Sequence, residues 1–232
     1  MLHFFRSTHR CILCHHHACR RICSDCYLLL QRLENPCPVC AMPNMPSRVT
    51  CGQCLHNPPH FDRVHGAFVY QAPIDQLIHG FKNRRQLITG RALAEWLLAA
   101  LKTHYATDRH TIDQLPDKIS ATPLFWRKQW SRGFNQSLWL SRYLCRRLGI
   151  DAFNGLRRIK ANNEQKTLTR RQRLQNLSHC FAVTQPLNGE HIAVVDDVVT
   201  TGATANAIAR VLKQAGAAKV TIWTIARTPR AE

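Results

Sequence analysis

The sequence predicts an α/β fold in which flanking helices cover a parallel sheet, preceded by a small cysteine-rich zinc module. Two observations carry this prediction. From residue 64 onward, apolar runs of strand length alternate with amphipathic helical patterns, which favours a parallel sheet. Nine of the eleven cysteines lie within residues 1–54. We therefore expect two domains, residues 1–60 and 61–232, with the boundary in a proline-rich stretch near residue 60.

The chain is strongly basic, with a formal net charge of +18 over 232 residues. Such a charge favours polyanionic partners, either nucleic acid or a polyphosphate ligand. A basic protein without such a partner is the alternative. No apolar run approaches the length of a membrane span, and no signal-peptide apolar region follows Met1, so we expect a cytoplasmic protein.

Eight of the N-terminal cysteines form four Cys-x-x-Cys knuckles. Two sulfurs at this spacing chelate one ion, and two knuckles complete a tetrahedral site, so the pattern predicts a double zinc ribbon. Sequential pairing of the knuckles is simplest, although crossed pairings and an iron–sulfur cluster stay open. Because the segment is too small for a core of its own, the metal should supply its folding energy. The predicted ligands are Cys11, Cys14, Cys23, Cys26, Cys37, Cys40, Cys51 and Cys54, which leaves Cys19 over.

The second domain should begin with a strand over residues 64–70, followed by amphipathic helices from residue 74 to 81 and about residue 88 to 105. Lys82 stands at the end of the first of these helices. It either complements the negative end of the helix or points at a diphosphate ligand.

A further strand is expected over residues 118–124, followed by a loop rich in cations and aromatic rings and then by another helix. The loop carries Arg127, Lys128, Arg132 and Phe134. These cations can hold a diphosphate leaving group, or the loop can neutralise and stack on single-stranded nucleic acid. The alternative is a solvated loop without a binding role, whose aromatic rings pack against the core.

Residues 154–180 are polar and basic and predict a long hairpin or lid, of the kind that closes over an active site to exclude water. A surface excursion without such a role is the alternative. Arg171 and Arg173 within this segment are further candidates for nucleic-acid contacts.

The most informative stretch is residues 191–204. The apolar run from Ile192 to Val195 predicts a buried strand, and a helical pattern follows residue 204. Between them stand two carboxylates and a small turn rich in hydroxyl groups. A turn at a helix N-terminus binds anions such as phosphate, while carboxylates suit sugar hydroxyls or a hydrated Mg²⁺ ion, so the stretch predicts a ribose 5-phosphate site. Its candidate residues are Asp196, Asp197, Thr200, Thr201, Gly202, Ala203 and Thr204.

This stretch resembles the phosphoribosyl diphosphate-binding motif of type I phosphoribosyltransferases. Together with the cysteine knuckles, Lys82, the Arg132-Gly133-Phe134-Asn135-Gln136 loop and the basic lid, it makes the whole chain resemble the ComF/GntX family. The resemblance implies a zinc ribbon joined to a type I phosphoribosyltransferase-like domain. It also implies a role in natural competence, as DNA uptake or the use of DNA as a nutrient.

Two functions follow, and the sequence leaves both open. In the first, the protein is a phosphoribosyltransferase that uses Mg²⁺-bound phosphoribosyl diphosphate, with Lys82, Arg127 and Arg132 as candidates for stabilising the leaving diphosphate. In the second, it is a catalytically silent module that senses phosphoribosyl diphosphate and binds single-stranded DNA. The zinc ribbon can also serve as a docking surface for other DNA-uptake proteins. No residue is an obvious base for an acceptor, and the sequence does not name that acceptor.

Overall fold

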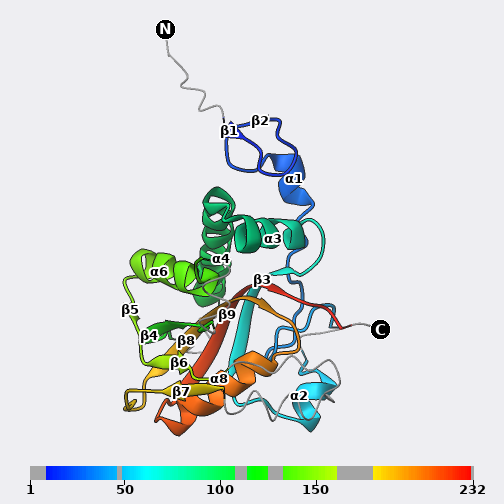
Figure 1. Cartoon of the computed structure of the whole chain (residues 1–232). Coiled ribbons are helices and arrows are strands. Elements are labelled where there is room, and N and C mark those ends of the chain that lie inside the picture. Colours follow the sequence, from blue (N-terminus) through cyan, green and yellow to red (C-terminus); the bar gives the residue numbers. More distant parts are fainter. Residues whose placement is uncertain (1–8, 46–48, 108–113, 125–132, 161–179, 231–232) are drawn as a thin grey trace.

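A five-stranded parallel sheet forms the centre of the computed structural model, which describes residues 9–45, 49–107, 114–124, 133–160 and 180–230 (Figure 1). The strand order is β3-β9-β8-β4-β5, and every neighbouring pair is parallel, as the alternation of strands and helices predicts. The strands are β3 (Arg63–Val69), β9 (Lys219–Arg227), β8 (His191–Val199), β4 (Lys118–Ala121) and β5 (Asp151–Ala152).

Helices cover both faces of this sheet (Figure 1). On one face lie α3 (Ile74–Arg84), α4 (Leu87–Thr107) and α6 (Gln136–Leu148), and on the other lies α8 (Ala203–Gln214). Strand β8 is apolar at successive positions because both of its faces are buried. Ile192 and Val194 join the core on the α8 side, whereas Ala193 and Val195 join the core under the other three helices.

In the described part of the cysteine-rich segment, residues 9–45 and 49–60, the elements are short. These are β1 (His9–Arg10), β2 (His17–Ala18), α1 (Ser24–Leu28) and α2 (Gly52–His56). Between the two halves of the segment, the chain runs antiparallel to β3. The backbone N–H of Leu33 donates to the carbonyl of Ala67 at 3.3 Å, and that of Val69 donates to Gln31 at 2.9 Å. The segment is thus joined to the edge of the main sheet. The domain boundary near residue 60 stays a prediction.

Strands β8 and β4 end at other residues than the sequence predicts. Strand β8 continues four residues beyond Val195, because its partner β9 pairs with it as far as Val199. Strand β4 ends at Ala121 rather than at residue 124, since Pro123 has no N–H to donate to a ladder. Two short strands at the ends of the predicted hairpin, β6 (Leu156–Arg158) and β7 (Phe181–Val183), pair antiparallel. Residues 161–179 between them lie outside the described part of the chain.

Within the described residues, no helix is both long enough and apolar enough to span a membrane.

Candidate functional site

The acidic pair, Asp196 and Asp197, stands at the carboxyl edge of the sheet. Strand β4 pairs with β8 only as far as Val195, whose carbonyl accepts a last hydrogen bond from the backbone N–H of Thr122 at 2.9 Å. From Asp196 onward, β8 keeps β9 as a neighbour but has run past the end of β4. Ligands of open α/β sheets bind outside this edge, so the strand overhang presents both carboxylates where a ligand would lie.

Asp197 forms an ion pair with Lys82. The Nζ atom of Lys82 lies 2.7 Å from Oδ2 of Asp197, while Oδ1 accepts a hydrogen bond from the backbone N–H of Val198 at 2.8 Å. Only 7% of Asp197 is exposed, so this charge is largely removed from water and depends on its partner. Lys82 is in the last turn of α3, and the structure brings this catalytic candidate to the acidic pair.

Asp196 is held in a different environment. Its Oδ1 accepts a hydrogen bond from the hydroxyl of Ser137 at 3.1 Å and another from the backbone N–H of Asp197 at 2.9 Å. Burial disfavours the charged form and the neighbouring carboxylate repels it, which together raise the pKa of Asp196 to about 7. The ionised form of Asp196 accepts hydrogen bonds, and the protonated form can also donate one. Both forms suit a sugar hydroxyl.

The turn of residues 200–204, called the phosphate turn below, leads from β8 into α8. Thr200 and Thr201 are exposed, and the backbone of Gly202 is left-handed with φ +78°. Glycine adopts this conformation without the steric cost that other residues incur. The Thr201 hydroxyl accepts a hydrogen bond from the N–H of Ala203, the first helical residue, at 3.3 Å. Thr204 is half-buried in the first turn. Backbone N–H groups and hydroxyls at a helix start form the arrangement that binds phosphate.

The loop before α6 holds the end of α3 in place. At Gly133, where φ is +74°, an added Cβ would lie 1.6 Å from the Arg85 guanidinium. Asn135 caps α6 by accepting from the N–H of Leu138 at 3.2 Å. The buried Gln136 amide donates to the carbonyl of Lys82 at 2.9 Å. Gly133 and Gln136 therefore hold the helix turn that carries Lys82, whereas Asn135 fixes the start of α6.

Phe134 packs edge to face against Phe81, with ring centroids 5.5 Å apart. This is the packing against the core that the alternative interpretation of the loop expected. A nucleic-acid role for Phe134 stays a prediction. The other cationic candidates, Arg127, Lys128, Arg132, Arg171 and Arg173, lie outside the described residues.

Ser137 and Arg227 belong to the site but were not found from the sequence. Ser137 is a small helical residue without a motif, and only the packing of α6 on β8 brings its hydroxyl to Asp196. Arg227 is the last residue of an apolar strand, and a cation at such a position is ordinarily expected to be exposed to solvent. The structure instead buries it behind the phosphate turn, with 3% of its surface exposed.

The eight knuckle cysteines gather into two groups of four, in the sequential pairing. The first cluster is Cys11, Cys14, Cys23 and Cys26, and the second cluster is Cys37, Cys40, Cys51 and Cys54; within each, the sulfur atoms all lie within 4.8 Å of one another. A tetrahedron of Zn–S bonds places sulfurs about 3.8 Å apart. The Sγ atoms of Cys14 and Cys23 are 3.7 Å apart, and those of Cys40 and Cys51 are 3.6 Å apart. Both clusters therefore fit a zinc ion.

In each cluster, the pKa of one cysteine thiol is lowered. Although burial opposes the charged form, backbone N–H donors outweigh it and lower the pKa of Cys11 to about 6 and that of Cys37 to about 7. Burial raises the pKa of Cys40 to about 11. A dication is therefore needed to stabilise four thiolates together.

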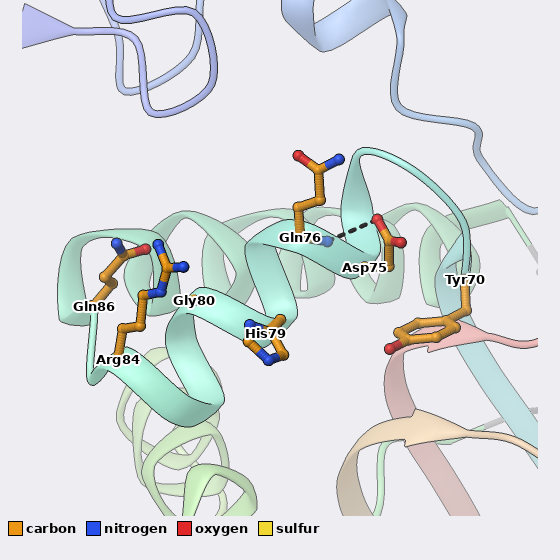
Figure 2. Close-up of a pocket in the computed structure, with 7 residues that line it drawn as sticks. All are labelled: Tyr70, Asp75, Gln76, His79, Gly80, Arg84 and Gln86. Atoms are coloured by element: carbon orange, nitrogen blue, oxygen red, sulfur yellow. Dashed lines mark hydrogen bonds between the residues drawn. The ribbon is translucent and has the colours of Figure 1, made fainter.

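A cavity of about 480 Å³ opens beside α3 (Figure 2). Tyr70, just past the end of β3, forms one wall, and its N–H donates to the carbonyl of Arg227 at 2.8 Å. The imidazole of His79 lies between this ring and the guanidinium of Arg84 in Figure 2. The lining residues are Tyr70, Asp75, Gln76, His79, Gly80, Arg84 and Gln86. An aromatic ring with several hydrogen-bonding groups suits a planar, polar ligand.

The chain is similar in sequence, over most of its length, to bacterial proteins named for DNA utilization and competence. The DNA utilization protein YhgH of Salmonella typhimurium is 38% identical over 209 residues, which cover 89% of this chain and 90% of that protein. Competence protein F of Haemophilus influenzae is 33% identical over 234 residues, or 98% and 100% of the two chains. This chain belongs to the ComF/GntX family. The resemblance inferred from the motifs is thereby confirmed.

The family assignment agrees with the domain found at the C-terminal end. Residues 135–232 match the model of the phosphoribosyl transferase domain, which spans the acidic pair and the phosphate turn. Among solved structures, glutamine phosphoribosylpyrophosphate amidotransferase from B. subtilis is 17% identical with a TM-score of 0.37, covering 57% of this chain and 25% of that one. By its domain match, this ComF/GntX member joins a phosphoribosyltransferase-like sheet to a module with two four-cysteine clusters.

Proposed function

We propose that this ComF/GntX protein binds phosphoribosyl diphosphate at the acidic pair and the phosphate turn, and takes part in DNA uptake or in the use of DNA as a nutrient. The observation that supports this most is the contact between Lys82 and Asp197 at the carboxyl edge of the sheet. It brings a cation for a diphosphate and a carboxylate for a ribose within 2.7 Å, next to a turn suited to the 5-phosphate. The DNA role is supported by the names of the relatives.

The ion pair suggests how the site changes when the ligand arrives. Without ligand, Lys82 neutralises Asp197, which keeps two carboxylates at adjacent positions tolerable. A diphosphate carries more negative charge than one carboxylate, so Lys82 can turn to it as it binds. Asp196 and Asp197 then accept hydrogen bonds from the ribose hydroxyls, whose donors replace the lost charge partner.

The chemistry proposed for the site is transfer of the phosphoribosyl group to an acceptor. Departure of diphosphate from the anomeric carbon builds positive charge on the ribose, and a nearby carboxylate stabilises that charge. Magnesium bound to phosphoribosyl diphosphate would neutralise the leaving group, and the acidic pair offers the oxygen atoms that this ion prefers. The cavity beside α3 offers a place for a planar acceptor such as a nucleobase.

Calorimetric titration of phosphoribosyl diphosphate with Mg²⁺ tests the proposal. We expect binding to the unaltered protein and loss of binding in Asp197→Asn, because the ribose loses a charged acceptor. The matched control is Glu190→Gln, which removes a carboxylate paired with Lys118 just before the same strand, at its amino end. Binding that survives in Asp197→Asn, or that is absent from the unaltered protein, contradicts the proposal.

A second candidate function is a DNA-binding sensor without catalysis, which the net charge of +18 favours. Two zinc ions held by eight thiolates lower this charge only to about +14. Binding of single-stranded DNA, followed by fluorescence anisotropy between 50 and 200 mM salt, should weaken steeply because phosphate contacts release counterions. Diphosphate release with an acceptor base favours the enzyme, whereas DNA binding modulated by phosphoribosyl diphosphate without turnover favours the sensor.

A further inference from the structure

One buried side chain joins the second cysteine cluster to the phosphate turn. Arg227, the last residue of β9, is 3% exposed. Its Nε donates to the carbonyl oxygen of Cys40 at 2.9 Å. Its Nη1 donates to the carbonyl of Val199 at 3.2 Å and also to the carbonyl of Thr200, the first residue of the phosphate turn. A single guanidinium thus contacts a metal-ligand residue on one side and the turn on the other.

The guanidinium of Arg227 depends on these acceptors for an electrostatic reason. A buried cation is costly unless hydrogen-bond acceptors replace the water that it loses. Arg227 obtains them from backbone carbonyls, including that of Thr228 at 2.8 Å. Because the guanidinium is planar and its N–H groups point in fixed directions, the carbonyl of Cys40 and those at the turn must keep a fixed separation. If the knuckle moves, the turn loses its donor.

A second set of contacts reaches the turn from the chain that follows the cluster. The backbone N–H of His60 donates to Oδ1 of Asn206, in the first turns of α8, at 2.6 Å. The buried ring of Phe61 lies close enough to Gly202 that a Cβ added there would be 3.8 Å from it. The phosphate turn is therefore supported on two sides by residues that adjoin the second cluster.

The first cluster has a different attachment. Arg21, in the loop of the first cluster, forms an ion pair with Glu95 of α4 at 2.9 Å. Helix α4 lies on the face of the sheet opposite to α8. Both partners are about one-third exposed. This arginine provides a matched control, since it too ties a cysteine cluster to the main domain but does not contact the turn.

We propose that the metal ion in the second cluster, acting through Arg227, positions the phosphate turn, so that metal and phosphoribosyl diphosphate stabilise each other's binding. The proposal rests on the proposed function for the identity of the ligand. Arg227 is a positioning residue here, since it contacts only the carbonyl side of the turn. Coupling between two sites is reciprocal, so the ligand must strengthen metal binding by the same free energy by which metal strengthens ligand binding.

Hydrogen–deuterium exchange of the zinc-loaded protein tests the structural half of the proposal. Amides of residues 200–204 should exchange about tenfold faster in Arg227→Lys and in Cys51→Ser, which removes a ligand of the second cluster without touching Arg227. They should be unchanged in Arg21→Ala and in Cys14→Ser, which removes a ligand of the first cluster. Unchanged exchange in Arg227→Lys, or equal acceleration by Cys14→Ser, overturns the proposal. If Cys51→Ser does not fold, the comparison of Arg227→Lys with Arg21→Ala decides.

Equilibrium competition for zinc with a chromogenic chelator tests the reciprocal half. We expect two zinc ions per chain, one of which is bound about tenfold more tightly when phosphoribosyl diphosphate and Mg²⁺ are present. In Arg227→Lys both ions should remain, but the ligand should no longer strengthen the binding of either. A purely structural role of Arg227 would not produce this ligand dependence. Ligand-independent zinc affinity in the unaltered protein, under conditions where calorimetry shows binding, contradicts the coupling.

Failure of the proposed function looks different from failure of the coupling. If the unaltered protein does not bind phosphoribosyl diphosphate, the ligand is wrong, but hydrogen exchange still decides whether the second cluster supports the turn. If it binds and Arg227→Lys binds equally well, the ligand stands and the coupling is wrong. The expected result is binding weakened about tenfold in Arg227→Lys and changed less than twofold in Arg21→Ala.

Discussion

The two cysteine clusters have the same ligands and nearly the same spacing, yet the fold uses them differently. The second cluster is part of a hydrophobic core with Phe61, Ile208 and Leu212, and all four of its cysteines are buried. The first cluster contacts the opposite core through Cys11 and Cys26, but it leaves Leu28 82% exposed and Leu29 65% exposed. One four-cysteine cluster is built into the main domain, whereas the other stands on its surface. Identical motifs thus acquire different roles from what surrounds them.

Substitution of the cysteines should give the largest difference in unfolding free energy between the two clusters. In Cys37→Ser/Cys40→Ser we expect the main domain to lose about 4 kcal/mol or more of unfolding free energy, because the cluster shares its core and a structural zinc site contributes folding energy. In Cys11→Ser/Cys14→Ser the main domain should change by about 1 kcal/mol. Urea unfolding followed by far-ultraviolet circular dichroism measures both. Equal losses would show that the two clusters are equivalent.

The two arginines that attach the clusters should differ next. Arg227→Ala should cost about 2–4 kcal/mol, because it leaves several buried carbonyl groups without a donor. Arg21→Ala should cost less than about 1 kcal/mol, since its ion pair with Glu95 is partly exposed to solvent. Urea unfolding measures both values. A cost for Arg21→Ala as large as that for Arg227→Ala would contradict the assignment of the first cluster to the surface.

The acidic pair should show a pH dependence of its own. The folded protein raises the pKa of Asp196 from 3.8 to about 7, so this group's contribution to stability is fully present below pH 3.8 and is lost as the pH rises through 7. Asp196→Asn removes that dependence. At pH 8 the variant should be about 1–2 kcal/mol more stable than the unaltered protein, with a smaller difference at pH 5.

Unfolding of the unliganded protein in urea at the two pH values checks this prediction. Glu190→Gln is the control, because pairing with Lys118 lowers the pKa of Glu190 to about 2, so its effect on stability should be the same at pH 5 and pH 8. The stability due to Glu190 is present above its unfolded pKa and is lost as the pH falls through 2. A stability difference for Asp196→Asn that is the same at pH 5 and pH 8 would rule out titration of Asp196 in this range.

The smallest effect is expected at Cys19, which belongs to neither cluster and is exposed. Cys19→Ser should leave zinc content at two ions per chain and unfolding free energy within about 0.5 kcal/mol. Metal analysis by mass spectrometry checks it. Loss of an ion would mean that Cys19 exchanges with a ligand of the first cluster.

Much of the fold and of the candidate site follows from local sequence. Knuckle spacing predicts the two four-cysteine groups because chelation by Cys-x-x-Cys is a short-range property. The apolar run before Asp196 predicts a buried parallel strand because both of its faces must be covered. Gly202 and its neighbouring threonines predict an anion-binding turn because helix starts leave N–H groups unbonded within the helix.

Tertiary structure decided what those pieces contact. The ion pair between Lys82 and Asp197 joins residues 115 positions apart, and Ser137 reaches Asp196 only because α6 packs on β8. Arg227 reaches Cys40 across 187 positions. No local pattern encodes such pairs, since they arise from the order of strands in the sheet and the way helices pack on it. The sequence by itself therefore determined which groups the protein has, and the packing determined which of them act together.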